Sequence, residues 1–200
     1  MQYSLPWQDK NMKQHSKSRG FTIPEILITL GIIAIVLSTA VPGISSMIKD
    51  NRLATQLNSV VTHIHIARAE AVKRDVRVIM CRSNSPNAIT PSCGGLANVW
   101  TSGYIVFADD GNYSNNLYDA GTDTLLLRGQ PVTSGITMHT SSSWNRNLEF
   151  NPDGSTNEGI GTVSIMSLCD DRKSDNGRQI QVAASGIPRM FSGNILTCDP

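Results

Sequence analysis

Residues 19–25, Arg-Gly-Phe-Thr-Ile-Pro-Glu, run directly into the apolar segment 26–41 (ILITLGIIAIVLSTAV), and this junction decides the fold of the chain. From Phe21 to Ile48, Glu25 is the only ionisable side chain. A helix of that length, at about 1.5 Å per residue, is long enough to cross about 30 Å of hydrocarbon. A carboxylate inside such a segment costs about 2.5–3.5 kcal/mol at a helix centre. We therefore expect a transmembrane helix over residues 21–48 in which Glu25 needs a partner.

Basic residues precede the apolar segment. Lys10, Lys13, Lys17 and Arg19 stand against the single acidic residue Asp9. By the positive-inside rule, the N-terminus lies in the cytoplasm and the remainder of the chain is extracytoplasmic.

Two simpler interpretations of the segment stay open. A secretory signal peptide has an apolar region of about 7–15 residues and a small-residue cleavage site, for which Ser38-Thr39-Ala40 is a poor fit. A plain signal anchor is the second. Neither explains Glu25, so neither is preferred.

Residues 20–25, Gly-Phe-Thr-Ile-Pro-Glu, resemble the class III signal of type IV prepilins and type II secretion pseudopilins. The resemblance implies that a prepilin peptidase cuts after Gly20, which ends a leader over residues 1–20. It also implies that Phe21 becomes the methylated first mature residue. Glu25 then matches the fifth-position glutamate of the family, and the new α-amino group of one subunit can pair with Glu25 of its neighbour. Burying both charges together costs less than burying either alone.

Removal of the leader changes the charge of the chain. The full sequence has 17 basic and 16 acidic residues, and the leader holds 4 and 1 of them, so 13 and 15 remain and the net charge becomes −2. The slight basicity of the full chain is therefore no evidence for an acidic partner.

The helix is expected to continue past the membrane segment, to about residue 74. Its amphipathic second half, residues 49–75, has an apolar face with steps of three and four residues. Pro42 and Gly43 are expected to kink it or melt it locally. The apolar face comprises Leu53, Leu57, Val60, Ile64, Ala67 and Ala71.

Residues 76–200 have the composition of an extracytoplasmic β-rich head. Short apolar runs separated by turn-rich segments predict an antiparallel sheet, covered by the amphipathic half of the helix. The predicted fold class is α+β and type IV pilin-like. The predicted strands are 76–81, 103–108, 124–128, 135–139, 147–150, 161–168 and 178–184.

The head also resembles the GspH/FimT group of minor pilins and pseudopilins. The resemblance is carried by residues 72–77, Trp100-x-x-Gly103-Tyr104-x-Val106-Phe107-x-Asp109, Phe150-Asn151-x-Asp153-Gly154, Leu168-Cys169-Asp170, Arg178 and Ser185-Gly186-x-Pro188-Arg189.

The four cysteines all follow the membrane segment, in an oxidising compartment where an even number indicates disulfides. The pairs Cys81–Cys93 and Cys169–Cys198 are favoured because each closes a local loop beside a predicted strand. A zinc site is the alternative, but the spacings contain no C-x₂-C pair and the histidines are scattered.

Other chemistry has little support. Asp109, Asp110, Asn112, Asp119 and Asp123 could ligate calcium, but the calcium-loop pattern is absent and a solvated acidic turn is favoured. His63 and His65 are read as helix-surface residues. The sequence contains no motif of a hydrolase, metalloprotease or nucleotide-binding enzyme, and we expect neither an enzyme nor a cofactor.

The expected function is that of a minor pilin, which primes or caps a type IV pilus near its tip. Its expected partners are other pilins, the prepilin peptidase and the inner membrane, with the head periplasmic before assembly and in the pilus or pseudopilus afterwards. A type II secretion pseudopilin is one alternative.

DNA uptake is the other alternative. Some members of the group bind DNA through a C-terminal Gly-Arg-x-Arg motif, where this chain has Gly186-Ile187-Pro188-Arg189. A weakened basic edge could still bind phosphates, although arginines solvated or paired with nearby aspartates are favoured. The candidate DNA-binding residues are Arg172, Lys173, Arg178 and Arg189.

Overall fold

The computed structural model describes residues 20–96, 98–111, 116–141, 144, 147–157, 161–172, 176–192 and 198. The chain divides into two compact units, Met1–Ile44 and Ser45–Pro200, and each is described by itself. The described residues form one long helix followed by eight strands, which confirms the α+β class expected from the sequence.

Helix α1 spans Ile23–Arg74, close to the predicted limits. It begins at Ile23 because the carbonyl of Thr22 accepts hydrogen bonds from the amides of Glu25 (3.1 Å) and Ile26 (3.2 Å). Pro24 lies in the first turn, where no intrahelical acceptor exists for an amide. Residues 42 and 43 are helical, so local melting at this point is wrong, while the kink stays a prediction.

In the first unit, α1 exposes large apolar side chains all round. Three hydroxyls of this segment are satisfied internally: those of Thr29, Ser38 and Thr39 each donate to a carbonyl three residues earlier, at 2.7–3.0 Å. By length and composition, α1 is able to cross a membrane. An apolar surface whose hydroxyls bond within the helix is suited to lipid or to other helices.

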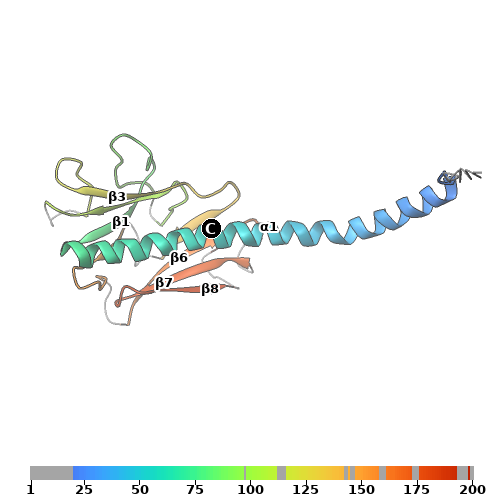
Figure 1. Ribbon diagram of the computed structural model, residues 1–200. Helices are drawn as coiled ribbons and strands as arrows, with labels where there is room; N and C mark the ends of the chain where they lie inside the picture. The colour runs from blue at the N-terminus through green and yellow to red at the C-terminus, as the bar shows by residue number, and fades with distance from the viewer. Residues whose placement is uncertain are drawn as a thin grey trace, which may run out of the picture. The chain divides into compact units, whose positions relative to one another are not determined.

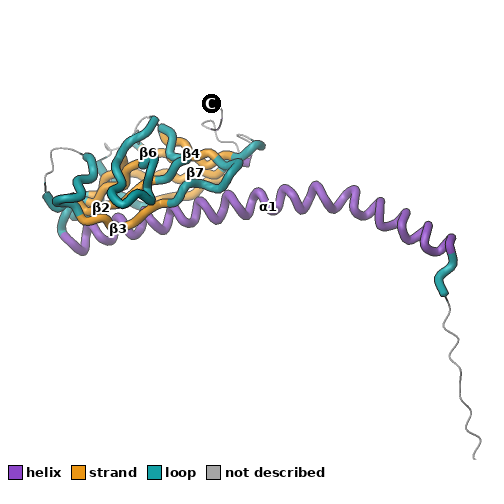
Figure 2. Tube along the Cα trace, turned by 90° about the horizontal axis from the view of Figure 1, so that it is seen from above, coloured by secondary structure: helices purple, strands orange, loops and turns teal. Residues whose placement is uncertain are grey.

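The second unit contains two four-stranded antiparallel sheets, where the sequence predicted a single sheet. In the view of Figure 1, the part of α1 that belongs to this unit runs across the head, with β1 and β3 above it and β7 and β8 below it. Figure 2 shows the strands on one side of the helix. The first sheet has the order β3 (Thr124–Gly129), β2 (Tyr104–Ala108), β1 (Val78–Arg82), β5 (Asn147–Phe150), and the second the order β4 (Thr137–Thr140), β6 (Val163–Cys169), β7 (Arg178–Ala183), β8 (Pro188–Ser192).

The apolar face predicted for the helix is buried in one core shared by both sheets. Its six residues, from Leu53 to Ala71, are at most 5% exposed. They pack with Val78, Met80 and Val106 of the first sheet, and with Met166, Leu168, Ile180 and Val182 of the second. Burial of such side chains contributes about 1.5–3 kcal/mol each, so this helix face holds the two sheets together.

Strands β1 and β2 are buried on both faces. Ile79, Cys81, Ile105 and Phe107 form a second apolar cluster on the side of the sheet that does not contain the helix core. This explains why 78–81 and 104–107 are unbroken apolar runs although antiparallel strands commonly alternate.

Seven of the eight strands match the sequence prediction to within about two residues, and β8 was missed. Proline cannot donate to a ladder and is therefore rare inside a sheet. In the structure Pro188 is the first residue of β8, which is the edge strand of its sheet, and this is a position that tolerates proline.

The aromatic residues Trp100, Tyr104, Phe107 and Phe150 are buried. The ring of Tyr104 lies directly against Gly129 of β3, where an added Cβ would come within 2.2 Å of the ring. The Tyr104 hydroxyl is 2.7 Å from Nδ1 of His63 on α1. Burial raises the pKa of Tyr104 well above its ordinary value and lowers that of His63, so a protonated phenol faces a neutral imidazole.

The close packing on Gly129 gives a stability prediction. Gly129→Ala should lower the free energy of unfolding of the mature protein by about 1–3 kcal/mol, because Tyr104 must move. Thermal unfolding in detergent micelles, followed by the fluorescence of the buried Trp100 and Trp144, measures the effect. Gly121→Ala is the matched control, since its Cβ would meet only Asp119 at an ordinary 3.5 Å. Equal melting temperatures for the two variants would contradict the prediction.

Candidate functional site

The predicted processing site lies just outside the helix. Gly20, Phe21 and Thr22 are not helical, and nothing lies within 4 Å of the Cβ position of Gly20. Phe21 is 80% exposed. The Gly20–Phe21 bond thus lies in exposed, non-helical backbone just before α1 begins at Ile23. A peptidase needs its substrate bond in such an accessible stretch.

The Glu25 carboxylate turns back onto the start of its own helix. Its Oε2 atom accepts a long hydrogen bond, 3.5 Å, from the amide of Thr22. This is one half of a capping box, in which a Thr at the N-cap and a Glu three residues later satisfy free helix amides. The Thr22-x-x-Glu25 spacing was a signal for this arrangement that the sequence reasoning did not use. The positive end of the helix dipole further favours the carboxylate there.

Glu25 forms no ion pair with any residue that the structure describes. A single amide at 3.5 Å leaves most of its acceptor capacity unused. The carboxylate is therefore held at the helix start and is open to a cation from another molecule.

A second polar site fastens the helix to the loop after β6. Arg172 donates to Asp170 through Nε and NH2, at 2.7–3.2 Å, and its NH2 also lies 2.9 Å from Asp50 of α1. Burial alone would raise the pKa of Asp170, but hydrogen bonds from Arg172 and its charge hold that pKa below the ordinary value. Lys49 adds a more exposed pair with Asp171 at 2.7 Å. We call residues 50, 170 and 172 the α1 clamp.

The four candidate DNA-binding residues are not brought together. Arg172 is engaged in the α1 clamp, and Lys173 lies outside the described residues. Arg178 and Arg189 lie on opposite faces of the second sheet, because Arg189 pairs with Gln181, three residues along β7 from Arg178. No single surface holds these two arginines.

The Gly186 stretch has a structural role. Gly186 has φ +71° in the turn between β7 and β8, and a Cβ there would lie 2.3 Å from the carbonyl oxygen of Gly154. That same oxygen accepts a hydrogen bond from Nε of Arg68 on α1 at 2.9 Å. Glycine is thus required by the backbone conformation and by the close approach of the two loops and the helix.

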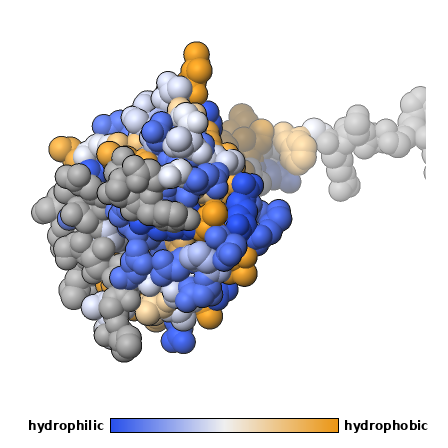
Figure 3. Space-filling model, turned by 90° about the vertical axis from the view of Figure 1, so that its left-hand side faces the viewer, coloured by the Kyte–Doolittle hydropathy of each residue, from blue (hydrophilic) through white to orange (hydrophobic). Residues whose placement is uncertain are grey.

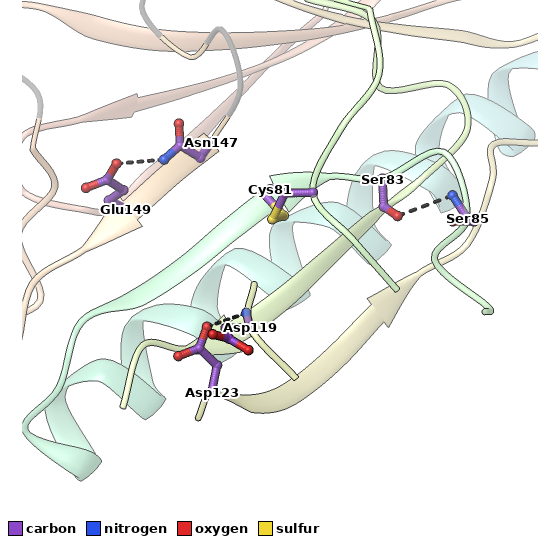
Figure 4. Close-up of a disulfide and its surroundings, with 8 residues drawn as sticks. Cys81, Ser83, Ser85, Asp119, Asp123, Asn147 and Glu149 are labelled. Atoms are coloured by element: carbon purple, nitrogen blue, oxygen red, sulfur yellow. Dashed lines mark hydrogen bonds between the residues drawn. A yellow bond between two sulfur atoms is a disulfide. The ribbon is translucent and has the colours of Figure 1, made fainter. Parts of the chain in front are cut away.

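The cysteines are paired as Cys81–Cys93 and Cys169–Cys198, both with Cα atoms 5.6 Å apart. Figure 4 shows the first at β1, near the Ser83–Ser85 turn. The loop that it closes is also held by Arg128, which donates to the carbonyls of Pro86 (2.6 Å) and Ala88 (2.7 Å).

The acidic loop after β2 is only partly solvated, which corrects the sequence interpretation. Asp109 is 2% exposed and accepts a hydrogen bond from Nε of Arg77 at 3.1 Å. Asp123 accepts from the amide of Asp119 at 2.8 Å, as Figure 4 shows. Asn112 lies outside the described residues, and the described part of the chain contains no group of three acidic, histidine or cysteine ligands arranged for a metal.

A long N-terminal helix followed by antiparallel sheets defines a type IV pilin-like fold. Residues 15–41 match the prokaryotic N-terminal methylation motif. Residues 56–186 match the type II transport protein GspH, and the chain belongs to this family.

Individual relatives agree with this assignment. The chain is 29% identical over 154 residues to the pilin-like protein PilA1 of Thermus thermophilus, a match that covers 74% of this chain and 86% of that protein. A crystal structure of the type IV minor pilin FimU of Pseudomonas aeruginosa has a TM-score of 0.52 at 17% identity, covering 72% of this chain and 90% of FimU. A second crystal form gives a TM-score of 0.50 at 16% identity, covering 70% and 92%. At these identities the structures show a shared fold.

The α1 clamp gives a prediction about stability and pH. Arg172→Ala leaves the carboxylate of Asp170 buried without a cation and should cost up to about 3 kcal/mol of unfolding free energy at neutral pH. Lys49→Ala, the control, removes an exposed pair and should cost less than about 1 kcal/mol.

The loss in Arg172→Ala should shrink in acid. The pKa of Asp170 is lowered in the folded state, so its pairing stabilises the protein above the unfolded pKa, near 4, and is lost as the pH falls through the folded pKa. Denaturant unfolding of both variants between neutral and acidic pH measures this, and a pH-independent difference would contradict it.

Proposed function

We propose that this protein is a minor pilin, a structural and assembly subunit of a type IV pilus that primes or caps the filament near its tip. Membership of the GspH family, the methylation motif and the fold shared with FimU support this proposal.

The observation that carries it is the state of Glu25. A carboxylate stands at the start of an exposed apolar helix and has no cation among the described residues. Cleavage after Gly20 creates an α-amino group on Phe21 of every subunit. Pairing that amine with Glu25 of a neighbour removes the unpaired charge only when subunits stack, so the charge favours assembly over the lone subunit.

The segments then take the following roles. Residues 1–20 are the leader that the prepilin peptidase removes, with methylation of Phe21. Residues 21–48 anchor the subunit in the inner membrane, with a cytoplasmic N-terminus, and later pack in the filament core. Residues 49–75 and 76–200 form the periplasmic helix half and head, and no catalytic or cofactor role is proposed for either.

A pseudopilin of a type II secretion system is the alternative function, because the matching family is named for a type II transport protein. A minor pseudopilin of a type II secretion system would use the same helix and the same Glu25. The two functions differ in the filament that contains the subunit, so the test must follow both surface pili and secretion.

The Glu25 hypothesis predicts a specific assembly defect. Glu25→Ala should be processed and inserted normally but should be absent from sheared surface filaments, because the intersubunit pair is lost. Thr29→Val is the matched control: it removes a polar group one turn later that bonds only to its own helix, and it should be incorporated. Immunoblots of membranes and of purified pili measure both steps, and normal incorporation of Glu25→Ala would refute the hypothesis.

A deletion strain distinguishes the two filament systems. A minor pilin gives fewer surface pili on deletion and leaves protein secretion intact, whereas a pseudopilin gives the reverse.

DNA uptake remains a second alternative, and it also has a direct test. Because Arg178 and Arg189 lie on opposite faces and Arg172 is paired, we expect the mature protein in detergent to give no shift of labelled duplex DNA at low salt. A salt-dependent shift that is lost in both Arg178→Ala and Arg189→Ala would show that DNA binding is real.

A further inference from the structure

The last strand of the head, β8, borders a groove that shows the features of a protein-docking site. β8 is the edge of its sheet and pairs only with β7 among the described strands. It therefore presents backbone groups along its other side, which is the usual template for an added strand. The groove, of about 230 Å³, is lined by Ala54, Leu57, Asn58, Arg178, Met190, Phe191 and Ser192.

The surface of β8 is unusually apolar for an edge strand. Ile187, Met190 and Phe191, within five residues, are 50%, 54% and 45% exposed. Natural edge strands are commonly blunted by charges, whereas this one carries a single arginine on its outer face. Elsewhere exposed apolar side chains on the head are scattered: the end of the head in Figure 3 is mostly hydrophilic, with isolated hydrophobic residues. Scattered apolar residues are normal, but Met190 pairs with Ile180 and so lies exposed on the groove face of β8, which indicates an interaction site; Phe191 pairs with Gln179 and points to the other face.

Arg178 gives the groove its chemistry. It is the first residue of β7 and shares a face with the buried Ile180 and Val182, so it lies on the helix side of the sheet. Its Nε atom is buried and has no hydrogen-bond partner among the described residues, and these residues supply no carboxylate to it. Among the described residues, no acidic side chain lines the groove. A buried Nε–H without an acceptor is costly, and a guanidinium binds a carboxylate strongly.

We propose that this groove binds an extended segment of a neighbouring filament subunit, with an Asp or Glu of that segment on Arg178 and an adjacent apolar side chain on Met190. The groove is smaller than the pockets of about 300–1,000 Å³ that hold small molecules, and it suits one or two side chains. Arginine and aromatic or methionine side chains at the centre of a contact are typical of interface hot spots. The inference rests on the proposed function, because only an assembled filament places another subunit beside β8.

The occupant is a protein segment and not a nucleic acid. A duplex would need several cations on one surface, but Arg189 points away from Arg178, and the groove is lined by both polar and apolar residues. A carboxylate on a peptide satisfies the guanidinium, and a neighbouring apolar side chain of the same peptide covers Met190, which lies on the same face as Arg178.

Photo-crosslinking in the producing cells tests the proposal. Met190 is replaced by p-benzoylphenylalanine in the full chain, and the crosslinked filament fraction is digested and mapped. Ile89, which is 99% exposed on a loop beside the other sheet, carries the same probe as the control for random collisions. The expected result is an adduct from position 190, and not from position 89, to a peptide of a neighbouring subunit that contains Asp or Glu.

Charge reversal tests the role of Arg178. Arg178→Glu should lower the yield of that adduct about tenfold, whereas Arg189→Glu, the same change on the opposite face, should lower it less than about twofold. Changing the partner carboxylate to Arg should restore the adduct in the Arg178→Glu strain. Thermal unfolding of each variant shows whether its head is folded. If a charge-reversal variant is unfolded, the adduct formed from position 190 in the chain with native Arg178 still decides the proposal.

Adducts to the chain's own residues or to DNA, or equal yields from positions 89 and 190, would overturn the proposal. Failure of the proposed function is a separate result, since it appears as absence of the chain from every filament. Failure of this inference appears as a chain that is in filaments and gives no specific adduct at position 190.

Discussion

The burial of one helix face against two sheets is the interaction on which the head depends. Among the described strands, none of one sheet pairs with a strand of the other, and both sheets share a core with the same six residues of α1. At about 1.5–3 kcal/mol for each large apolar side chain, this face is comparable with the whole stability of a typical domain. The helix of a filament-forming protein is thus also the central structural element of its head.

Polar contacts also join α1 to the loops and strands of the head. The α1 clamp holds residue 50, Gln56 bonds to Thr133 at 3.1 Å, His63 meets Tyr104, and Arg68 bonds to the carbonyl of Gly154. Each contact joins α1 to a different loop or strand of the head. Disulfides close the loops next to two of the strands, β1 and β6. Apolar burial gives the head its stability, and the polar contacts determine how helix and loops are aligned.

Local patterns predicted what depends on local physics. The helix face from Leu53 to Ala71 and seven strands followed from periodicity, since each burial pattern repeats within its own element. The division into two sheets did not follow, because pairing partners are chosen by long-range packing that no single strand encodes. β8 was missed because Pro188 excludes a central strand but permits an edge, and only the topology shows that the strand is at an edge. Likewise, the Thr22-x-x-Glu25 spacing indicates a capping box, but the sequence prediction considered only a partner for Glu25 on another subunit and not the amide of Thr22.

The β7–β8 hairpin shows why a motif must be judged by its place in the fold. Read along the chain, Gly186 and Arg189 belong together with Arg178 as a basic cluster. In the sheet, the glycine serves a tight turn beneath Arg68, and the register sends the two arginines to opposite faces. One arginine is left in solvent, and the other lies in a groove to which the described residues contribute no carboxylate. Phosphates need several cations on one surface, whereas one guanidinium beside Met190 suits a single carboxylate on a partly apolar peptide. The geometry of the hairpin thus moves Arg178 from nucleic-acid recognition to contact between subunits.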